Sequence, residues 1–379
     1  MSKVAIVHDY LHDYGGAEKC LESWLKEYPE ADIYTSIFTP ENFETSKEIT
    51  EAYKDGRIKT TKLQFFQPFL KRFFKHFFWL YPLFMWFVRI KDYDLVFISA
   101  TFCGKYVKLK NCQKVIFYCH TPTRFLHNLT TETDYKSLNP ILQFLIPFFK
   151  FPLKYLDIRA IEYLKDNNVQ FVANSNYIKT TIKDIYKTDS LVIFPPTDLQ
   201  KFFEVQRKPE NIQDFYFYFG RISFHKRIDI LVKACQKLDK RLIVAGGSPL
   251  KQEIENLKKT AGNNPKIQFL GRISDDEIKN YLSKCKAFLF AGKEDFGIAP
   301  VEALASGTPI IMYQAGGALE FVKPGVNGLF FDDQNENSLA EAILEFEKKN
   351  DWNNEQIRET SKEFSEETFL AKFKELASQ

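Results

Sequence analysis

The chain has 379 residues, of which 45% are hydrophobic and 27% charged, so it is long enough to bury the cores of two ordinary domains. Its 52 Lys and Arg against 49 Asp and Glu leave a net charge of +3, which is too balanced for a protein whose main partner is nucleic acid. Six cysteines are scattered without a C-x-x-C pair, which argues against a disulfide framework or a zinc site and fits a reducing compartment.

Short apolar runs alternate with helical patterns along the chain, which predicts parallel sheets covered by helices on both faces. The expected strands are residues 4–7, 95–98, 115–118, 170–173, 192–194, 216–219, 242–245, 267–270, 287–290 and 310–312. The predicted fold class is therefore α/β, doubly wound, with the strands in two series. The first run is too short for a signal peptide, so we expect the mature protein to start here, in the cytosol.

The first expected strand runs into a polar loop, residues 8–18, in which Gly15 and Gly16 precede a helix. His8 and His12 are four residues apart, a spacing that suits zinc, but a third ligand is not in sight. We therefore expect no metal and treat both histidines as ordinary polar loop residues.

Basic and aromatic residues interleave between residues 57 and 91, which contain eight Lys or Arg and no Asp or Glu. The aromatic residues are Phe65, Phe66, Phe69, Phe73, Phe74, Phe77, Phe78, Trp79, Tyr81, Phe84, Trp86 and Phe87. The longest uncharged run, 76–88, is too short to span a bilayer, but the mixture suits the headgroup interface of an anionic membrane. Residues 138–155 have the same character. The alternative is that these aromatics pack in the core of the first domain, and nucleic-acid binding is a weaker interpretation without a recognition motif.

A second polar loop follows the strand 115–118 and contains His120, Thr121 and Arg124. His120 is expected at the carboxyl end of its strand, facing a cleft between the domains, where polar residues are often functional. A structural histidine with satisfied hydrogen bonds is the alternative.

Two prolines, Pro195 and Pro196, stop the strand before them and mark a domain boundary at about residue 196. The segment 364–378 has a helical apolar pattern with no strand after it, so it must pack on an existing surface. The expected domains are 1–196, 197–360 and a C-terminal helix, 361–379, that packs back on the N-terminal domain.

The densest chemical pattern is residues 291–309, which read as a strand end, a glycine turn and a helix beginning near Ile298 and ending at Gly307. The backbone N–H groups and positive end of such a helix suit a phosphate oxygen. Glu294 and Glu302 flank that point, and a carboxylate that accepts hydrogen bonds from vicinal hydroxyls can hold a sugar or a ribose.

Gly220, Arg221 and Lys226 directly follow the strand 216–219, and the two cations can converge on a diphosphate. Further turns at the same sheet edge carry Gly246, Arg272 and Ile273. Ligands of open α/β sheets bind at that edge. The chain has no G-x-x-x-x-G-K-[ST] motif, which counts against a kinase or an ATPase.

Together these motifs resemble the family 4 retaining glycosyltransferases, which have two facing Rossmann-like domains, the B-type glycosyltransferase fold. Glu294 and Glu302, with seven residues between them, match that family's paired glutamates. Residues 220–221 and Lys226 match its Gly-Arg…Lys element. The resemblance implies that Glu294 contacts hydroxyls of the transferred sugar, that Glu302 contacts the ribose, and that Arg221 and Lys226 neutralise the leaving diphosphate.

The resemblance also implies further site residues. The other donor-binding residues are Gly15, Gly16, Gly220, Gly246, Arg272, Ile273, Phe296, Gly297, Ile298 and Ala299. His120 is expected near the reacting carbon, as a catalytic residue together with Glu294, Arg221 and Lys226. The expected acceptor-binding residues are Asp9, His120, Thr121 and Arg124. The stretch around His120 looks closest to mannosyl- and rhamnosyl-type transferases of bacterial surface polysaccharide synthesis.

The expected activity is transfer of a mannose-like hexose from a nucleoside-diphosphate sugar to a lipid-linked saccharide, as in O-antigen and lipopolysaccharide synthesis. We expect no cofactor and no metal, because cations at the diphosphate can lower the barrier. The expected location is cytoplasmic, peripheral at the inner face of the plasma membrane, on an anionic surface and without nucleic acid. The alternatives are a nucleotide-sugar epimerase or hydrolase, a phosphorylase with pyridoxal phosphate, and an inert membrane-docked binding module.

Overall fold

The computed structural model describes residues 2–67, 77, 79–127, 129, 140–248, 250–349 and 351–379; within 140–147 and at 149 only the backbone is described. The chain divides into two compact units. The N-terminal unit comprises Met1–Pro195 and Phe369–Gln379, and the C-terminal unit comprises Pro196–Thr368.

The N-terminal unit contains a seven-stranded parallel sheet in the order β3-β2-β1-β5-β7-β8-β9. Its strands are β1 (Val4–His8), β2 (Asp32–Thr35), β3 (Ile58–Thr60), β5 (Leu95–Ala100), β7 (Lys114–Cys119), β8 (Gln170–Ala173) and β9 (Leu191–Val192). A separate parallel pair consists of β4 (Arg89–Lys91) and β6 (Lys108–Lys110).

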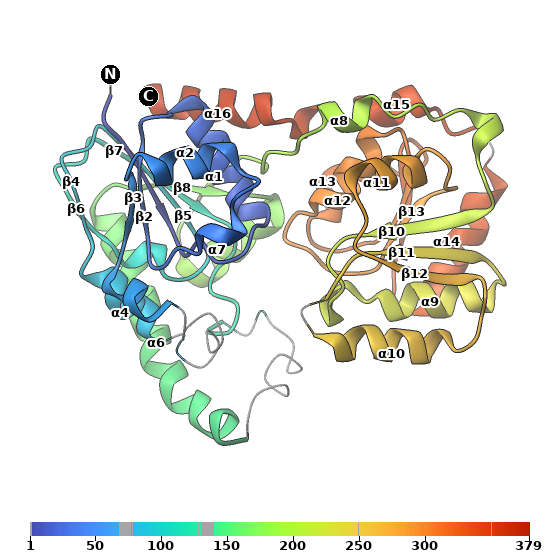
Figure 1. Ribbon diagram of the computed structural model, residues 1–379, viewed down its shortest axis with the longest axis horizontal. Helices are drawn as coiled ribbons and strands as arrows, with labels where there is room; N and C mark the ends of the chain where they lie inside the picture. The colour runs from blue at the N-terminus through green and yellow to red at the C-terminus, as the bar shows by residue number, and fades with distance from the viewer. Residues whose placement is uncertain are drawn as a thin grey trace. The chain divides into compact units, whose positions relative to one another are not determined.

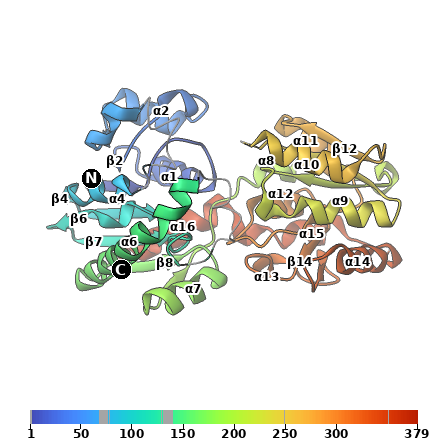
Figure 2. The ribbon, with the colours of Figure 1, turned by 90° about the horizontal axis from the view of Figure 1, so that it is seen from below.

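Helices cover both faces of this sheet, which is why its central strands are apolar on both sides. One face packs on α1 (Gly16–Glu27), α2 (Lys47–Lys54) and α16 (Glu366–Ser378). The other packs on α4 (Leu80–Trp86), α6 (Pro140–Asp166), α7 (Asn176–Tyr186) and the 3₁₀ helix η4 (Gly104–Tyr106). Figure 2 shows α2 and α7 at opposite edges of the sheet, in agreement with the strand order.

The helix α16 closes the core of the N-terminal unit, although it comes from the end of the chain (red in Figure 1). Phe369 and Phe373 are each 1% exposed and pack against Trp24 with ring centroids 5.5 and 5.2 Å away. The expected helix 364–378 begins slightly later, because Phe364 belongs to a separate 3₁₀ turn, η7 (Lys362–Phe364).

The C-terminal unit contains a six-stranded parallel sheet in the order β12-β11-β10-β13-β14-β15. Its strands are β10 (Phe215–Phe219), β11 (Arg241–Ala245), β12 (Ile267–Gly271), β13 (Phe288–Phe290), β14 (Ile310–Tyr313) and β15 (Gly328–Phe331). Numbered within the unit, this is the order 3-2-1-4-5-6 of dinucleotide-binding sheets. The prediction of a doubly wound α/β fold is therefore confirmed.

The helices of this unit again form two layers. They are α8 (Gln200–Phe203), α9 (Ile228–Lys237), α10 (Lys251–Ala261), α11 (Asp275–Leu282), α12 (Ile298–Ala305), α13 (Ala318–Phe321), α14 (Glu336–Lys348) and α15 (Asn354–Glu359). Figure 1 shows α9 and α10 on one side of the sheet and α11, α12 and α13 on the other, and α14 packs against α9.

Six strand predictions needed correction. The strands β2, β3, β4, β6 and β15 were not expected, because each is only three or four residues long and all but β15 contain polar side chains. The expected strand 192–194 is instead β9, Leu191–Val192, which ends before the two prolines. Periodicity is a weak signal for strands this short.

Candidate functional site

The sheet of the C-terminal unit reverses its strand order between β10 and β13, and ligands of open α/β sheets bind outside the carboxyl ends of the strands at such a point. Lys226, in the 3₁₀ helix η6 (Phe224–Lys226), follows β10, and Glu294 follows β13. Lys226 Nζ lies 2.6 Å from Glu294 Oε1. Their side chains are 18% and 22% exposed, so a ligand can reach this charge-assisted pair.

Glycines allow the loops at this edge to approach one another closely. A Cβ on Gly246, where φ is +145°, would lie 1.8 Å from the carbonyl oxygen of Gly220. A Cβ on Gly292 would lie 2.8 Å from the carbonyl oxygen of His225, beside Lys226. No larger residue fits at these positions without moving the backbone, so the glycines fix the loops that carry the Lys226–Glu294 pair.

Two arginines predicted for the donor site also lie at this edge. Arg221 is exposed, and within the described residues its guanidinium makes no hydrogen bond or ion pair. Its carbonyl accepts a hydrogen bond from the hydroxyl of Tyr218 at 3.0 Å. Burial raises the pKa of that hydroxyl, and Glu294 adds to the shift. Arg272 runs beside Gly247, where a Cβ would lie 2.8 Å from Arg272 Nε.

The expected turn and helix are present, with α12 beginning at Ile298 after Gly297, which adopts φ +110°. Glu302 lies within α12 and is 8% exposed. The loop before the helix is held by Gly317, whose N–H donates to the carbonyl oxygen of Glu294 at 2.8 Å. The N-terminal N–H groups of α12 therefore start one short loop after Glu294, as an anion site at a helix N-terminus requires.

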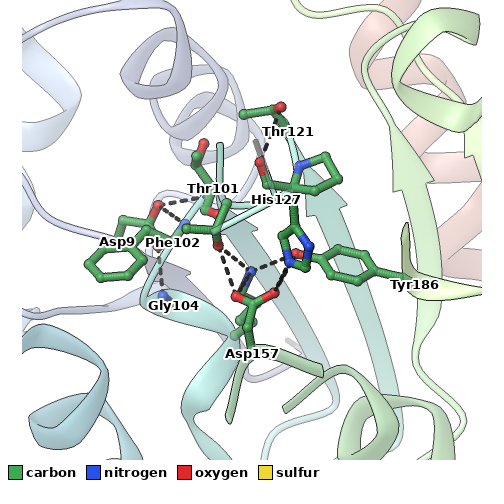
Figure 3. Close-up of polar contacts among 11 residues, drawn as sticks. Asp9, Thr101, Phe102, Gly104, Thr121, His127, Asp157 and Tyr186 are labelled. Carbon is green, nitrogen blue, oxygen red and sulfur yellow. Dashed lines mark hydrogen bonds and ion pairs between the residues drawn. The ribbon is translucent and has the colours of Figure 1, made fainter. Parts of the chain in front are cut away.

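In the N-terminal unit, Asp9 anchors the loop after β5 (Figure 3). Its carboxylate accepts hydrogen bonds from the backbone N–H groups of Thr101, Phe102 and Gly104 at 2.7, 2.8 and 2.6 Å. Asp9 is 7% exposed. These contacts give Asp9 a structural role beside the acceptor contact that was predicted for it.

Asp157 on α6 is the centre of a second buried network (Figure 3). It lies 2.6 Å from Lys105 Nζ and 2.9 Å from His127 Nε2, and accepts from the hydroxyls of Thr123 and Tyr186 at 2.9 Å each. Burial by itself would raise its pKa, but Lys105 and His127 outweigh burial and lower the pKa of Asp157 from 3.8 to about 2. The network pins the loop after β7, in which Thr121 is buried and Arg124 half-buried, to α6 and α7.

His120 ends a hydrogen-bonded chain of side chains. Its Nε2 lies 2.8 Å from Ser99 Oγ, which lies 3.2 Å from His8 Nδ1. His8 Nε2 lies 3.2 Å from Glu18 Oε1. Burial, and to a smaller extent His8, lowers the pKa of His120 to about 3, so this imidazole is neutral at physiological pH.

The chain from Glu18 to His120 includes residues that sequence reasoning missed. Ser99 was not singled out, although a serine that follows a continuous run of buried apolar residues in a strand indicates a buried polar partner. His8 and His12 have separate partners, because His12 Nδ1 contacts Thr39 Oγ1 at 3.1 Å. Within the described ranges, no three His, Cys, Asp or Glu side chains are grouped to hold a metal ion.

A cavity of about 290 Å³ lies at the opposite end of the C-terminal sheet. Its lining includes Lys286 and Pro309, which precede β13 and β14, together with Trp352. Because ligands of such sheets bind at the carboxyl ends, we do not assign the donor site to this cavity.

Exposed aromatic side chains form a stripe on α6. Phe148, Phe151 and Tyr155 are 67%, 82% and 61% exposed, and their spacing of three and four residues places them on one helix face. Of the earlier stretch, Phe65, Phe66 and Phe87 are exposed and Tyr81 is fully buried, so part of it belongs to the core, as the alternative proposed. Phe69, Phe73, Phe74 and Phe78 lie outside the described residues. Among the helices that are described, none is both long and apolar enough to cross a bilayer.

Comparison with known proteins gives matches over both units. A family model described as glycosyltransferase family 4 matches residues 14–201, and one described as glycosyl transferases group 1 matches residues 198–366. An uncharacterized glycosyltransferase of Methanocaldococcus jannaschii is 31% identical over 209 residues, which cover 54% of this chain and 56% of that protein. The chain thus spans little more than half the length of this relative.

Two further matches cover nearly the whole chain. The O-antigen chain mannosyltransferase C of Escherichia coli is 23% identical over 384 residues, which cover 96% of this chain and 92% of that protein. The crystal structure of Anabaena HepE in complex with UDP aligns with a TM-score of 0.68 at 18% identity and covers 99% of both chains.

Proposed function

Because this chain belongs to glycosyltransferase family 4 and has the two parallel-sheet α/β domains of the B-type glycosyltransferase fold, we propose that it is a retaining, metal-independent glycosyltransferase. The donor is a nucleoside-diphosphate hexose, with mannose or a mannose-like sugar favoured by the similarity to mannosyltransferases. The acceptor is a lipid-linked saccharide in the synthesis of O-antigen or another surface polysaccharide.

The observation that carries this proposal is the Lys226–Glu294 pair at the point where the sheet reverses its strand order. An ammonium group has three donors, so Lys226 can keep Glu294 as a partner while it binds a phosphate oxygen. Glu294 in turn has acceptor capacity left for sugar hydroxyls. Arg221, exposed at the same edge, supplies a second cation for the diphosphate.

These groups suit the departure of a nucleoside diphosphate. When the bond between the sugar carbon and the phosphate oxygen breaks, negative charge grows on the diphosphate, and Arg221, Lys226 and the N–H groups of α12 stabilise it. The departing phosphate oxygen can take the proton of the acceptor hydroxyl, which attacks from the same face of the sugar. In this mechanism His120, neutral at physiological pH, positions a substrate hydroxyl rather than acting as the base.

A thermal-shift panel with UDP, GDP, ADP and dTDP tests the donor site. A nucleotide present at about 100 times its Kd stabilises the native state by about 2.7 kcal/mol, which for a domain of this size is a shift of roughly 5–10 °C. We expect one nucleotide to shift the native protein and Arg241→Ala but not Arg221→Ala. Arg241 is the matched control, because it is an exposed arginine at the start of β11, away from the proposed site.

Turnover of Glu294→Ala and Lys226→Ala then tests the chemistry. Both variants should fold and lose sugar transfer by orders of magnitude. Normal transfer by both would refute the site assignment, and release of free sugar without an acceptor would favour the hydrolase alternative. A failure of every nucleotide to shift the native protein would favour an inert binding module.

We also propose that the exposed stripe on α6 docks the enzyme on the anionic inner face of the plasma membrane, where a lipid-linked acceptor resides. Lys154 is exposed beside Phe151 and Tyr155, so cationic and aromatic groups are offered together. Tyr155→Ser should weaken co-sedimentation with phosphatidylglycerol vesicles several-fold. Tyr53→Ser, which removes a 50% exposed tyrosine from α2 of the same unit, should not. Equal binding by both variants would contradict the assignment.

A further inference from the structure

Three neighbouring strands of the N-terminal unit bring one polar side chain each to the same sheet edge. His8 on β1 is the register partner of Ser99 on β5, so both side chains leave the sheet on the same face. His120 directly follows β7, the next strand, and the backbone N–H of His120 donates to the carbonyl oxygen of Ala100 at 3.2 Å. The sheet itself therefore aligns His8, Ser99 and His120, and α1 adds Glu18 at the far end.

The order of donors and acceptors along this chain follows from its first member. A carboxylate only accepts hydrogen bonds, so the His8 nitrogen that faces Glu18, Nε2, carries a hydrogen. The other nitrogen of a neutral His8 is then an acceptor and receives the hydroxyl hydrogen of Ser99. Because the Ser99 hydroxyl donates its hydrogen to His8, the Ser99 oxygen accepts from His120 Nε2–H at 2.8 Å. The remaining nitrogen of His120, Nδ1, is left with a lone pair.

Burial makes this order hard to rearrange. Ser99 is 0% exposed, His8 2% and Glu18 7%, so water cannot take the place of a missing partner. His120 is half-buried, and within the described residues its Nδ1 has no hydrogen-bond partner. The glycine that precedes α1 contributes too, since a Cβ on Gly15 would lie 3.2 Å from Glu18 Oε2 and crowd the carboxylate.

We infer that Glu18, His8 and Ser99 are positioning residues that hold His120 in the Nε2–H tautomer, so that its Nδ1 accepts a hydrogen bond from a sugar hydroxyl. This inference rests on the proposed function for the role of His120, whereas the tautomer follows from the hydrogen bonds of the four side chains with His8 neutral. Acting through His120, the three residues orient a substrate without touching it.

The tautomer is read directly from the ring ¹⁵N chemical shifts of protein labelled at its histidines, with His120 assigned from the spectrum of His120→Asn. We expect the native protein to show Nε2–H at His120. Ser99→Ala should give a mixture of both tautomers, and kcat should fall about 5- to 10-fold with little change in the donor KM, as for the loss of one orienting hydrogen bond. Ser99→Thr, which keeps the hydroxyl, should restore both readouts.

Ser23→Ala is the matched control. It removes another serine hydroxyl that is 1% exposed in the same unit and that donates to the carbonyl oxygen of Lys19 within α1. The His120 signals and kcat of this variant should match those of the native protein. The control therefore separates a general loss of stability in the unit from loss of the hydrogen bonds between Glu18 and His120.

An Nδ1–H signal at His120 in the native protein would overturn the inference, as would native tautomer and kcat in Ser99→Ala. A failure of this kind in a protein that transfers sugar leaves the proposed function standing. A native protein that shows the Nε2–H tautomer but transfers no sugar refutes the proposed function, and with it the role assigned to these residues.

Discussion

Replacing Asp157 with Asn should unfold the N-terminal unit at a much lower temperature. The substitution keeps the shape of the side chain but only one of the two oxygens that accept from Thr123 and Tyr186, and it leaves Lys105 charged opposite a neutral amide. Lys105 and Asp157 are 1% and 0% exposed and lie 2.6 Å apart, so water cannot compensate the lost partner. Breaking such a buried pair costs about 3–5 kcal/mol, which is roughly 6–20 °C for a domain of about 200 residues.

Tryptophan fluorescence is a suitable readout, because three of the four tryptophans, Trp24, Trp79 and Trp86, precede the boundary between the units at Pro195. The second arm is the double variant Lys105→Met/Asp157→Asn, which removes both charges and should recover much of the loss. The reasoning is refuted if Asp157→Asn melts within a degree of the native protein, or if the double variant melts no higher than Asp157→Asn.

Three further results are expected. Gly246→Ala should destabilise the C-terminal unit by more than the roughly 1–2 kcal/mol that a positive φ costs a residue with a Cβ, because this Cβ would meet the Gly220 carbonyl oxygen. Gly325→Ala, at φ +76° in open space, is the control. Equal melting temperatures of the two variants would contradict the close approach at Gly246. Because the pKa of Asp157 is lowered to about 2, this carboxylate contributes stability above pH 4 that is lost as the pH falls towards 2. Urea titrations at falling pH should therefore show the stability gap between the native protein and Asp157→Asn closing, and a constant gap would contradict this assignment. Phe373→Ala should lower the free energy of unfolding of the N-terminal unit, measured in urea, by about 3–5 kcal/mol. A decrease of less than about 1 kcal/mol would place α16 outside the core.

The central strands could be predicted from the sequence because each is buried on both faces and so reads as a continuous apolar run. The strand β3 could not, because it is an exposed three-residue edge with Lys59 at its centre. The helix α12 could be predicted for a local reason, because Gly297 precedes its first residue and Gly307 lies just beyond its last. Local signals of this kind lie within a few residues of the structure that they specify.

The pairings that build the sites are not local. Lys226 and Glu294 meet because β10 and β13 are neighbours, and that strand order cannot be read from either motif. Ser99 meets His120 for the same reason, through β5 and β7. Asp157 did leave a signal, because an acidic residue on the face of α6 that also buries Leu153 and Ala160 requires a buried partner. Its partner Lys105 could be found only from the fold.

The position of α16 has a consequence for the order in which the protein acquires its structure during synthesis. The C-terminal unit is one continuous stretch, Pro196–Thr368, and can complete its own core as soon as that stretch has left the ribosome. The N-terminal unit emerges first but finishes last, because Trp24 stays without the rings of Phe369 and Phe373 until the final helix is made. During that interval its apolar face is open to chaperones and to aggregation.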